Sequence, residues 1–330
     1  MEIIPNVYQL PLPIPNNPLM FINAYLVKSS QGCLLIDTGW NTDESFNSLK
    51  TQLGEAGVSL TDIRFIAVTH IHPDHYGLVG RLEKHTKASL TIHHLERSFL
   101  NSRYVNYDSL VEETGRWLEI NGVPEDARKS LKRASLEVLG MVEVAMPDRV
   151  VHGGEQFTIG EFSFEVIWTP GHSAGHICFY ERTHRLFFSG DHILPTITPN
   201  VSMNSQNTGN PLVDYRNSLR QVARYDVALV LPGHGNVFSN FQDRIKEIDQ
   251  HHEVRLNEMV GIINSQPKTA YQVAMKATWK NPWNELSALH RRSAVTETLA
   301  HLELLVARGT LKKTMQDGLV WYSVNGENAF

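Results

Sequence analysis

The chain has 330 residues, of which 42% are hydrophobic and 20% charged, and its formal net charge is −5 at pH 7. This composition is typical of a soluble globular protein with room for one large domain and an appendage, or for two domains. The acidic balance excludes a global attraction for nucleic acid, so such binding would need a local basic patch. Cys33 and Cys178 lie in apolar runs, so we expect buried thiols rather than a disulfide framework or a cysteine-ligated metal.

The sequence carries no signal for export or for a membrane. Residues 1–5 lack the basic and apolar regions of a signal peptide. No stretch approaches the roughly 18 uninterrupted apolar residues that suggest a membrane-spanning helix. We therefore expect a cytoplasmic protein without a membrane partner.

The first part of the chain predicts short strands followed by a helix. Apolar runs separated by Pro, Asn and Gly indicate strands at residues 7–12, 20–27 and 33–36. The third strand ends at an acidic residue, Asp37. Either Thr42 or Asp43 is then expected to cap a helix. The inner face of this helix would be formed by Phe46, Leu49 and Leu53.

Residues 69–77, which read T-H-I-H-P-D-H-Y-G, contain four side chains that can bind a metal: His70, His72, Asp74 and His75. The preceding run is apolar and β-branched like a buried strand, and residues 76–87 have the apolar spacing of a helix. The four side chains are therefore expected on a strand-to-helix turn. Such a turn can offer imidazoles to one metal and a carboxylate with an imidazole to a second. Imidazole and carboxylate without thiolate suit zinc, with iron and manganese as alternatives.

A further buried strand is expected at residues 89–92, and strands that alternate with helices predict an α/β layered sandwich. From residue 95 to about residue 145 the apolar residues instead recur at helical spacing, including a helix from Pro124 toward Met141. An insertion of this kind can cover a site, make a homodimer contact or add core helices. The sequence leaves these three roles open.

The second half of the chain places further metal-binding side chains where strands end. Strands are expected at residues 149–152, 156–159, 162–168, 186–189 and 227–231. His172 follows the third of these strands, Asp191 the fourth and His234 the fifth, each directly after a glycine. Strand ends are where α/β proteins commonly hold their functional groups.

The tail has a different pattern. A long helix is expected at residues 238–263, followed after Pro267 by helices at 270–277 and 293–308 and by a β-hairpin at 310–323. Helices followed by a hairpin resemble a winged helix. Residues 268–330 contain eight Lys or Arg and five Asp or Glu, a net charge of +3. Because this surplus is small, we favour a packing, pocket-wall or dimerisation role over nucleic-acid binding.

The motifs H-x-H-x-D-H, G-H-S-x-G-H, S-G-D and P-G-H-G, in this order, closely resemble the metallo-β-lactamase superfamily over about residues 1–245. The resemblance implies a catalytic domain of the α/β class, an αββα sandwich with a dinuclear metal site at one edge and a helical insertion at about 95–145. Residues 246–330 would form a connecting helix and a C-terminal winged-helix-like domain. By motif position, one metal would be held by His70, His72 and His172, the other by Asp74, His75 and His234, with Asp191 bridging them.

The resemblance also implies two zinc ions per chain that share a hydroxide, which attacks the substrate. Asp74 would be catalytic, since it would orient this hydroxide and pass its proton to the leaving atom. Asp37 would orient a ligand histidine without binding the metal itself. His176 and His192 match no ligand position in the motifs and would support a ligand or line the pocket.

Departures from known members narrow the activity. Asp191 stands where true β-lactamases often have Cys, which argues against antibiotic hydrolysis. Residues 192–195 include no Tyr, unlike the members that open homoserine-lactone rings, and the glyoxalase-like hydrolases lack the insertion. We therefore predict a hydrolase that cleaves an ester, thioester or lactone bond of a small molecule.

Three other functions compete with this prediction. The main alternative is a metal-dependent endoribonuclease or phosphodiesterase that holds nucleic acid with its tail. A di-iron redox enzyme would normally need a flavin partner, and no such module is visible in the sequence. A regulatory protein with an inactive site is disfavoured by the complete set of ligands.

Overall fold

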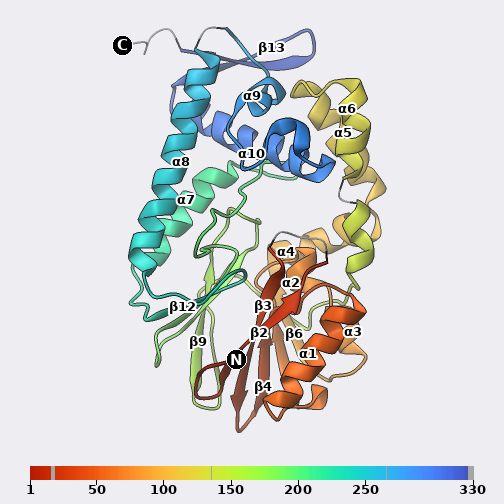
Figure 1. The fold of residues 1–330 in the computed structure, drawn as a ribbon, viewed down its shortest axis with the longest axis vertical. Helices are drawn as coiled ribbons and strands as arrows, with labels where there is room; N and C mark the ends of the chain where they lie inside the picture. The colour runs from red at the N-terminus through yellow and green to blue at the C-terminus, as the bar shows by residue number, and fades with distance from the viewer. Residues whose placement is uncertain (16–18, 135, 265, 326–330) are drawn as a thin grey trace.

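The computed structural model describes residues 1–15, 19–134, 136–264 and 266–325, and its main body is two β-sheets packed face to face (Figure 1). The first sheet has seven strands in chain order, antiparallel from β1 to β4 and parallel from β4 to β7. Its strands are β1 (Glu2–Ile4), β2 (Val7–Pro13), β3 (Phe21–Ser29), β4 (Gly32–Ile36), β5 (Ile63–Ala67), β6 (Ser89–His93) and β7 (Arg149–Val151). The second sheet has the order β12-β11-β10-β9-β8, with only β11 and β12 parallel. Its strands are β8 (Gln156–Ile159), β9 (Phe162–Trp168), β10 (Ile177–Glu181), β11 (Leu186–Gly190) and β12 (Leu229–Pro232).

Helices cover the outer faces of both sheets. Helices also form the upper part of the molecule in Figure 1, whereas the sheets lie in the lower part. The α-helices are α1 (Asp43–Glu55), α2 (Pro73–Tyr76), α3 (Val79–Glu83), α4 (His94–Leu100), α5 (Asp108–Ile120), α6 (Glu125–Arg133), α7 (Pro211–Val222), α8 (Phe241–Ile263), α9 (Ala270–Lys276) and α10 (Ala288–Ala307). Shorter turns are η1 (Leu60–Asp62), η2 (Asn101–Val105), η3 (Leu136–Met141) and η4 (Trp283–Glu285). A hairpin of β13 (Leu311–Gln316) and β14 (Leu319–Val324) follows α10.

Three hydrophobic layers confirm the αββα arrangement. One cluster lies between the first sheet and the helices α1 and α3, and a second fills the space between the two sheets. A third joins the outer face of the second sheet to α7 and α8. Strand β10 shows the alternation directly, because Ile177 and Phe179 belong to the layer between the sheets while Cys178 and Tyr180 belong to the outer layer.

Most predicted elements are present, with a few corrections. Thr42 caps α1 by accepting a hydrogen bond from the Ser45 N–H, as expected for a helix start. The helix predicted at residues 76–87 is wrong in its extent, because the chain forms two short helices, α2 and α3, whose connection is held by a hydrogen bond from Leu78 N to Gly39 O. The helix predicted from Pro124 toward Met141 ends at Arg133 and is followed by the 3₁₀ turn η3. Strands β1 and β10 were not predicted.

The insertion and the tail share one hydrophobic core with the second sheet. Leu118 of α5 and Leu131 of α6 lie in the same buried cluster as Val295 of α10 and Tyr322 of β14. Figure 1 shows α5 and α6 beside α9 and α10, at the same end of the molecule. The insertion therefore supplies core helices, one of its three predicted roles. The helices and hairpin predicted for the tail are present, while its likeness to a winged helix, the domain boundary near residue 245 and a homodimer contact remain predictions.

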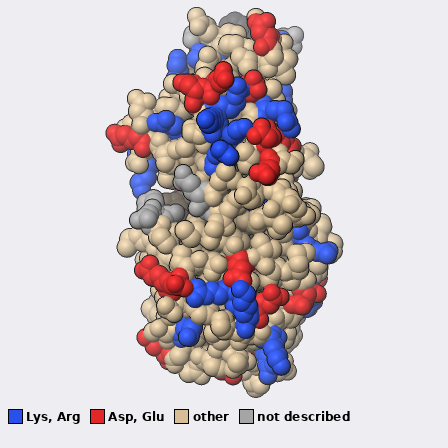
Figure 2. Space-filling view, turned by 90° about the vertical axis from the view of Figure 1, so that its right-hand side faces the viewer, with Lys and Arg blue, Asp and Glu red and all other residues tan. Residues whose placement is uncertain are grey.

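The surface charges are mixed. On the face drawn in Figure 2, Lys and Arg side chains are interspersed with Asp and Glu side chains near both ends of the molecule. Two basic residues of the tail are paired with acids: Lys313 Nζ lies 2.8 Å from Glu303 Oε1, and Arg308 Nη2 lies 2.9 Å from Glu253 Oε1. Among the described residues, no helix is both long and apolar enough to cross a membrane.

Candidate metal centre

The seven predicted ligands meet where four segments leave the two sheets. His70 and His72 lie between β5 and α2, and Asp74 and His75 lie in α2 itself, as the strand-to-helix turn predicted. The other three follow strands of the second sheet: His172 after β9, Asp191 after β11 and His234 after β12. The two sheets therefore contribute to one site from opposite sides.

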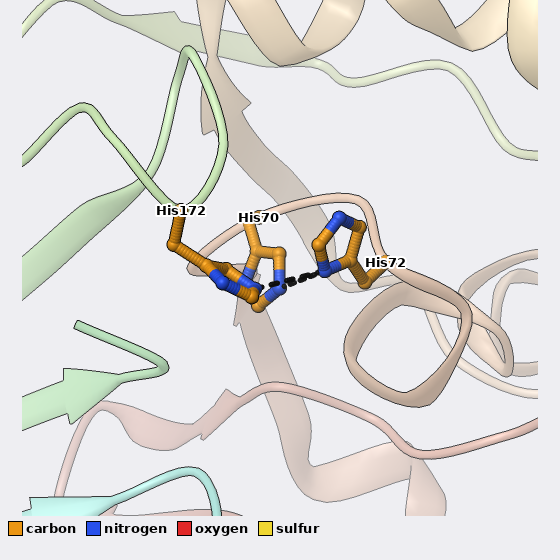
Figure 3. Close-up of side chains that lie close together, drawn as sticks. All are labelled: His70, His72 and His172. Carbon is orange, nitrogen blue, oxygen red and sulfur yellow. Dashed lines mark hydrogen bonds between the residues drawn. The ribbon is translucent and has the colours of Figure 1, made fainter. Parts of the chain in front are cut away.

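Three imidazoles form the first group of this site. The Nδ1 atom of His72 lies 2.9 Å from His70 Nε2 and 3.0 Å from His172 Nε2. Figure 3 shows the three rings converging, with His172 on a loop of the second sheet and the other two on a loop of the first. These three residues form one of the groups whose ligand atoms all lie within 4.8 Å of one another.

The second group combines carboxylates with imidazoles. Asp74 Oδ2 lies 3.2 Å from His234 Nε2 and 4.0 Å from His75 Nε2. Asp191 lies between the two groups, with Oδ1 3.4 Å from His75 Nε2 and Oδ2 3.6 Å from both His172 Nε2 and His234 Nε2. Two groups of potential ligands thus match the sets that the motif positions implied, while a third group joins His70, His75 and Asp191 across them.

The chemistry of these side chains fits divalent cations. In three histidines, the ring nitrogen that faces away from the site is bonded to an oxygen that can only accept a hydrogen bond, so this nitrogen carries a proton. When the ring is neutral, the lone pair of its other nitrogen therefore faces the site. The pairs are His75 Nδ1 with Asp37 Oδ2 at 2.8 Å, His172 Nδ1 with Asn200 O at 2.8 Å and His234 Nδ1 with Phe21 O at 3.0 Å.

Two inward-facing atoms have no hydrogen-bond partner. His75 Nε2 and Asp191 Oδ1 are buried and lie 3.4 Å from each other, but neither makes a hydrogen bond within the described residues. Unpaired buried polar atoms are costly and rare in native proteins. A cation that accepted lone pairs from both atoms would remove this cost.

The two groups also differ in the pKa values of their side chains. Burial lowers the pKa of His70, His72 and His172 below the ordinary value, which favours the neutral form of these three imidazoles. In the second group, burial acts to lower the pKa of His234, but the carboxylates of Asp191 and Asp74 outweigh this effect and raise the pKa to about 9. At Asp74, burial acts to raise the pKa, but His75 and His234 outweigh this effect and lower the pKa to about 2. The second group therefore holds protons that a metal would have to displace.

Asp37 occupies the supporting position predicted for it. Its carboxylate is 2% exposed and accepts hydrogen bonds from Thr69 N at 2.8 Å and Thr69 Oγ1 at 2.9 Å, besides its contact with His75. Its backbone has φ = 60°, a conformation that non-glycine residues adopt at a cost. Asp37 thus fixes the ring of His75 and the start of the ligand loop together.

His176, whose role the sequence left open, supports Asp191. The backbone N–H of Asp191 donates to His176 Nε2 at 3.1 Å, so the proton of this imidazole lies on Nδ1, which faces Thr169 Oγ1 at 2.8 Å. Gly190 allows this contact, because a Cβ there would lie 2.8 Å from His176 Nε2. His192 is buried and lies outside all three groups of potential ligands, and burial lowers its pKa to about 3.

Asn200 is a supporting residue that the sequence did not reveal. Its carbonyl accepts the hydrogen bond from His172, and its side-chain amide donates to Glu297 Oε2 at 3.0 Å. Burial raises the pKa of Glu297, which belongs to α10, to about 7. A helix of the tail therefore reaches the loop that orients a ligand, although nothing in the local sequence of either residue signals this.

The chain belongs to the metallo-beta-lactamase superfamily, whose family model matches residues 17–234. It is similar to the probable metallo-hydrolase YqjP of Bacillus subtilis (strain 168), with 26% identity over 307 residues that cover 91% of this chain and 92% of that protein. It is also 29% identical over 222 residues to the acyl-coenzyme A thioesterase MBLAC2 of Gallus gallus, covering 66% of this chain and 73% of that protein.

Similarity to a solved structure extends over nearly the whole chain. The crystal structure of a metallo-beta-lactamase family protein from Thermus thermophilus has 28% sequence identity and a TM-score of 0.85. The match covers 98% of this chain and 100% of that one. The insertion and the tail are therefore part of the shared architecture.

Proposed function

We propose that this protein is a dinuclear metal-dependent hydrolase that cleaves an ester, thioester or lactone bond of a small molecule. The position of Asp191 between the two groups of potential ligands carries this proposal, since it lies within 3.6 Å of His172 in one group and of His234 in the other. Two zinc ions per chain are the proposed cofactors. Iron and manganese are the alternatives that these nitrogen and oxygen ligands also accept.

When bound, two divalent cations would activate water near neutral pH and polarise the bond to be cleaved. Asp74 is the proposed general base. Its carboxylate is 17% exposed and therefore open to the site, and its lowered pKa keeps it ionised and able to accept a proton from the attacking water. The same group returns the proton to the leaving oxygen or sulfur. His234 Nε2, 3.2 Å from Asp74 Oδ2, faces the same part of the site as this carboxylate.

Within this class, a thioester is the favoured bond. The similarity to a protein named acyl-coenzyme A thioesterase supports it. The test is turnover of the purified, zinc-loaded protein on matched chromogenic esters, thioesters, lactones and phosphodiesters, with the same acyl group wherever the bond type allows. We expect the thioester to have the highest kcat/KM and the phosphodiester to show no turnover above background. Turnover of the phosphodiester alone would overturn the proposed bond class.

The nuclease alternative predicts that basic residues of the tail bind nucleic acid. We expect weak binding of single-stranded RNA, and no change when Lys312 and Lys313 are both replaced by Gln, because Lys313 is already paired with Glu303. The measurement is RNA affinity across a salt series. Each lysine that binds a phosphate would, when replaced, reduce the slope against log salt by somewhat under one unit. Tight, salt-dependent binding that the double variant abolishes would favour the nuclease.

A further inference from the structure

A buried carboxylate of the insertion joins the two loops that carry the three-histidine group. Glu96 of α4 is 1% exposed. Its Oε2 accepts a hydrogen bond from Ile71 N at 3.0 Å, and its Oε1 accepts one from Gly175 N at 2.7 Å. Ile71 lies between His70 and His72 in the chain, and Gly175 lies three residues after His172. One side chain therefore bridges both parts of the group.

The insertion also binds the other backbone group of Ile71. The hydroxyl of Tyr104 in η2 donates to the carbonyl of Ile71. Burial raises the pKa of Tyr104, so its hydroxyl keeps the proton that it donates. Both backbone groups of Ile71 are thus bonded to side chains of the insertion.

The hydrogen bond between Glu96 and Gly175 requires α4 to lie very close to the loop that carries His172. A Cβ at Gly175 would lie 2.8 Å from both the Cγ and the backbone N of Glu96, and 2.7 Å from His93 Nδ1. Any larger residue at position 175 would push α4 away from the loop. The carboxylate is therefore enclosed by the two loops that it connects.

We propose that Glu96 is a positioning residue that sets the spacing of His70 and His72 relative to His172, and thereby the metal affinity of the three-histidine group. This inference rests on the metal-dependent function proposed above. The carboxylate offers an acceptor to each loop, and charged acceptors make strong hydrogen bonds with backbone N–H groups. Groups that orient metal ligands typically change metal affinity by about 10- to 100-fold when they are removed.

The test replaces Glu96 with Gln in the full chain. An amide keeps the shape but turns one of its two acceptors into an NH₂ group, which would face a backbone N–H. We expect the affinity for one of the two zinc ions to fall by about tenfold or more, measured by competition with a chelator. We also expect the visible spectrum of the cobalt-loaded protein to change, since it reports the geometry around the ion.

Glu181→Gln is the matched control. Glu181 is also buried, at the far end of β10 from His176, and accepts hydrogen bonds from Thr183 N at 3.1 Å and His184 N at 2.8 Å. If Glu96 acts by positioning the two ligand loops, the Glu181→Gln variant should have a lower Tm but the zinc affinity and cobalt spectrum of the wild type. If both variants lose zinc affinity in proportion to their loss of stability, Glu96 has only a structural role and the inference is wrong.

Tyr104→Phe decides the question if the Glu96 variant does not fold, because it removes one hydroxyl and leaves the packing. A weaker zinc affinity and an altered cobalt spectrum are then expected. Wild-type affinity and spectrum in every variant that folds would overturn the inference while leaving the proposed function intact. Failure of the wild-type protein itself to bind zinc or another transition metal would instead contradict the proposed function, and the inference with it.

Discussion

Replacing Asp74 with Asn should leave the fold intact and lower kcat by about 100-fold or more. The amide has nearly the same shape as the carboxylate, so the packing of α2 should be preserved. It cannot accept the proton of the attacking water, however, and it removes a negative charge 3.2 Å from His234 Nε2. The measurement is steady-state turnover on the best substrate of the panel, with metal content and circular dichroism recorded on the same sample.

Asp226→Asn provides the control for this substitution. The Asp226 side chain is 76% exposed and pairs with Arg185, which is 52% exposed, so it lies outside the site. This variant should retain wild-type turnover and metal content. Near-normal turnover of the Asp74 variant with both metals bound would show that another group acts as the base.

Removing the metals should abolish hydrolysis and destabilise the protein. Without cations, His75 Nε2 and Asp191 Oδ1 stay buried without a hydrogen bond. At a thousandfold excess over Kd, a ligand that binds only the folded state contributes about 4 kcal/mol, so we expect Tm to fall by several degrees in the chelated protein. Reloading with zinc should restore both activity and Tm, with two ions per chain by metal analysis.

Magnesium serves as the control in the reloading experiment. It prefers oxygen ligands and binds imidazole poorly, so it should restore neither Tm nor activity. One zinc ion per chain after reloading would rule out the dinuclear proposal. Iron in the purified protein, together with redox activity, would favour the redox enzyme instead.

The sequence alone determined the fold class and the identity of the seven clustered side chains. Both depend on local patterns. The strands that lead to the site are short apolar runs, and in open α/β sheets the ends of such strands are where functional groups gather. The ligand stretch at residues 69–77 could be interpreted without any tertiary information, because four of its nine residues can bind metals and the flanking periodicity places them on a turn.

Some elements escaped prediction even though their signal is local. Strand β10 is an uninterrupted apolar run of four residues followed by Glu181, but it comes directly after the loop that carries His172 and His176. A short run of this kind has no periodicity of its own, so helix and strand cannot be distinguished. Its pairing with β9 and β11 decides that it is a strand.

Only the tertiary structure decided which groups support the ligands. Glu96 and Gly175 are 79 residues apart in the chain, and His234 and Phe21 are 213 residues apart. Such contacts depend on how the two sheets face each other and on where the insertion packs, and no sequence period reports either. The same holds for the shared core of the insertion and the tail, because an amphipathic helix reveals that it has a buried face but not which partner covers it.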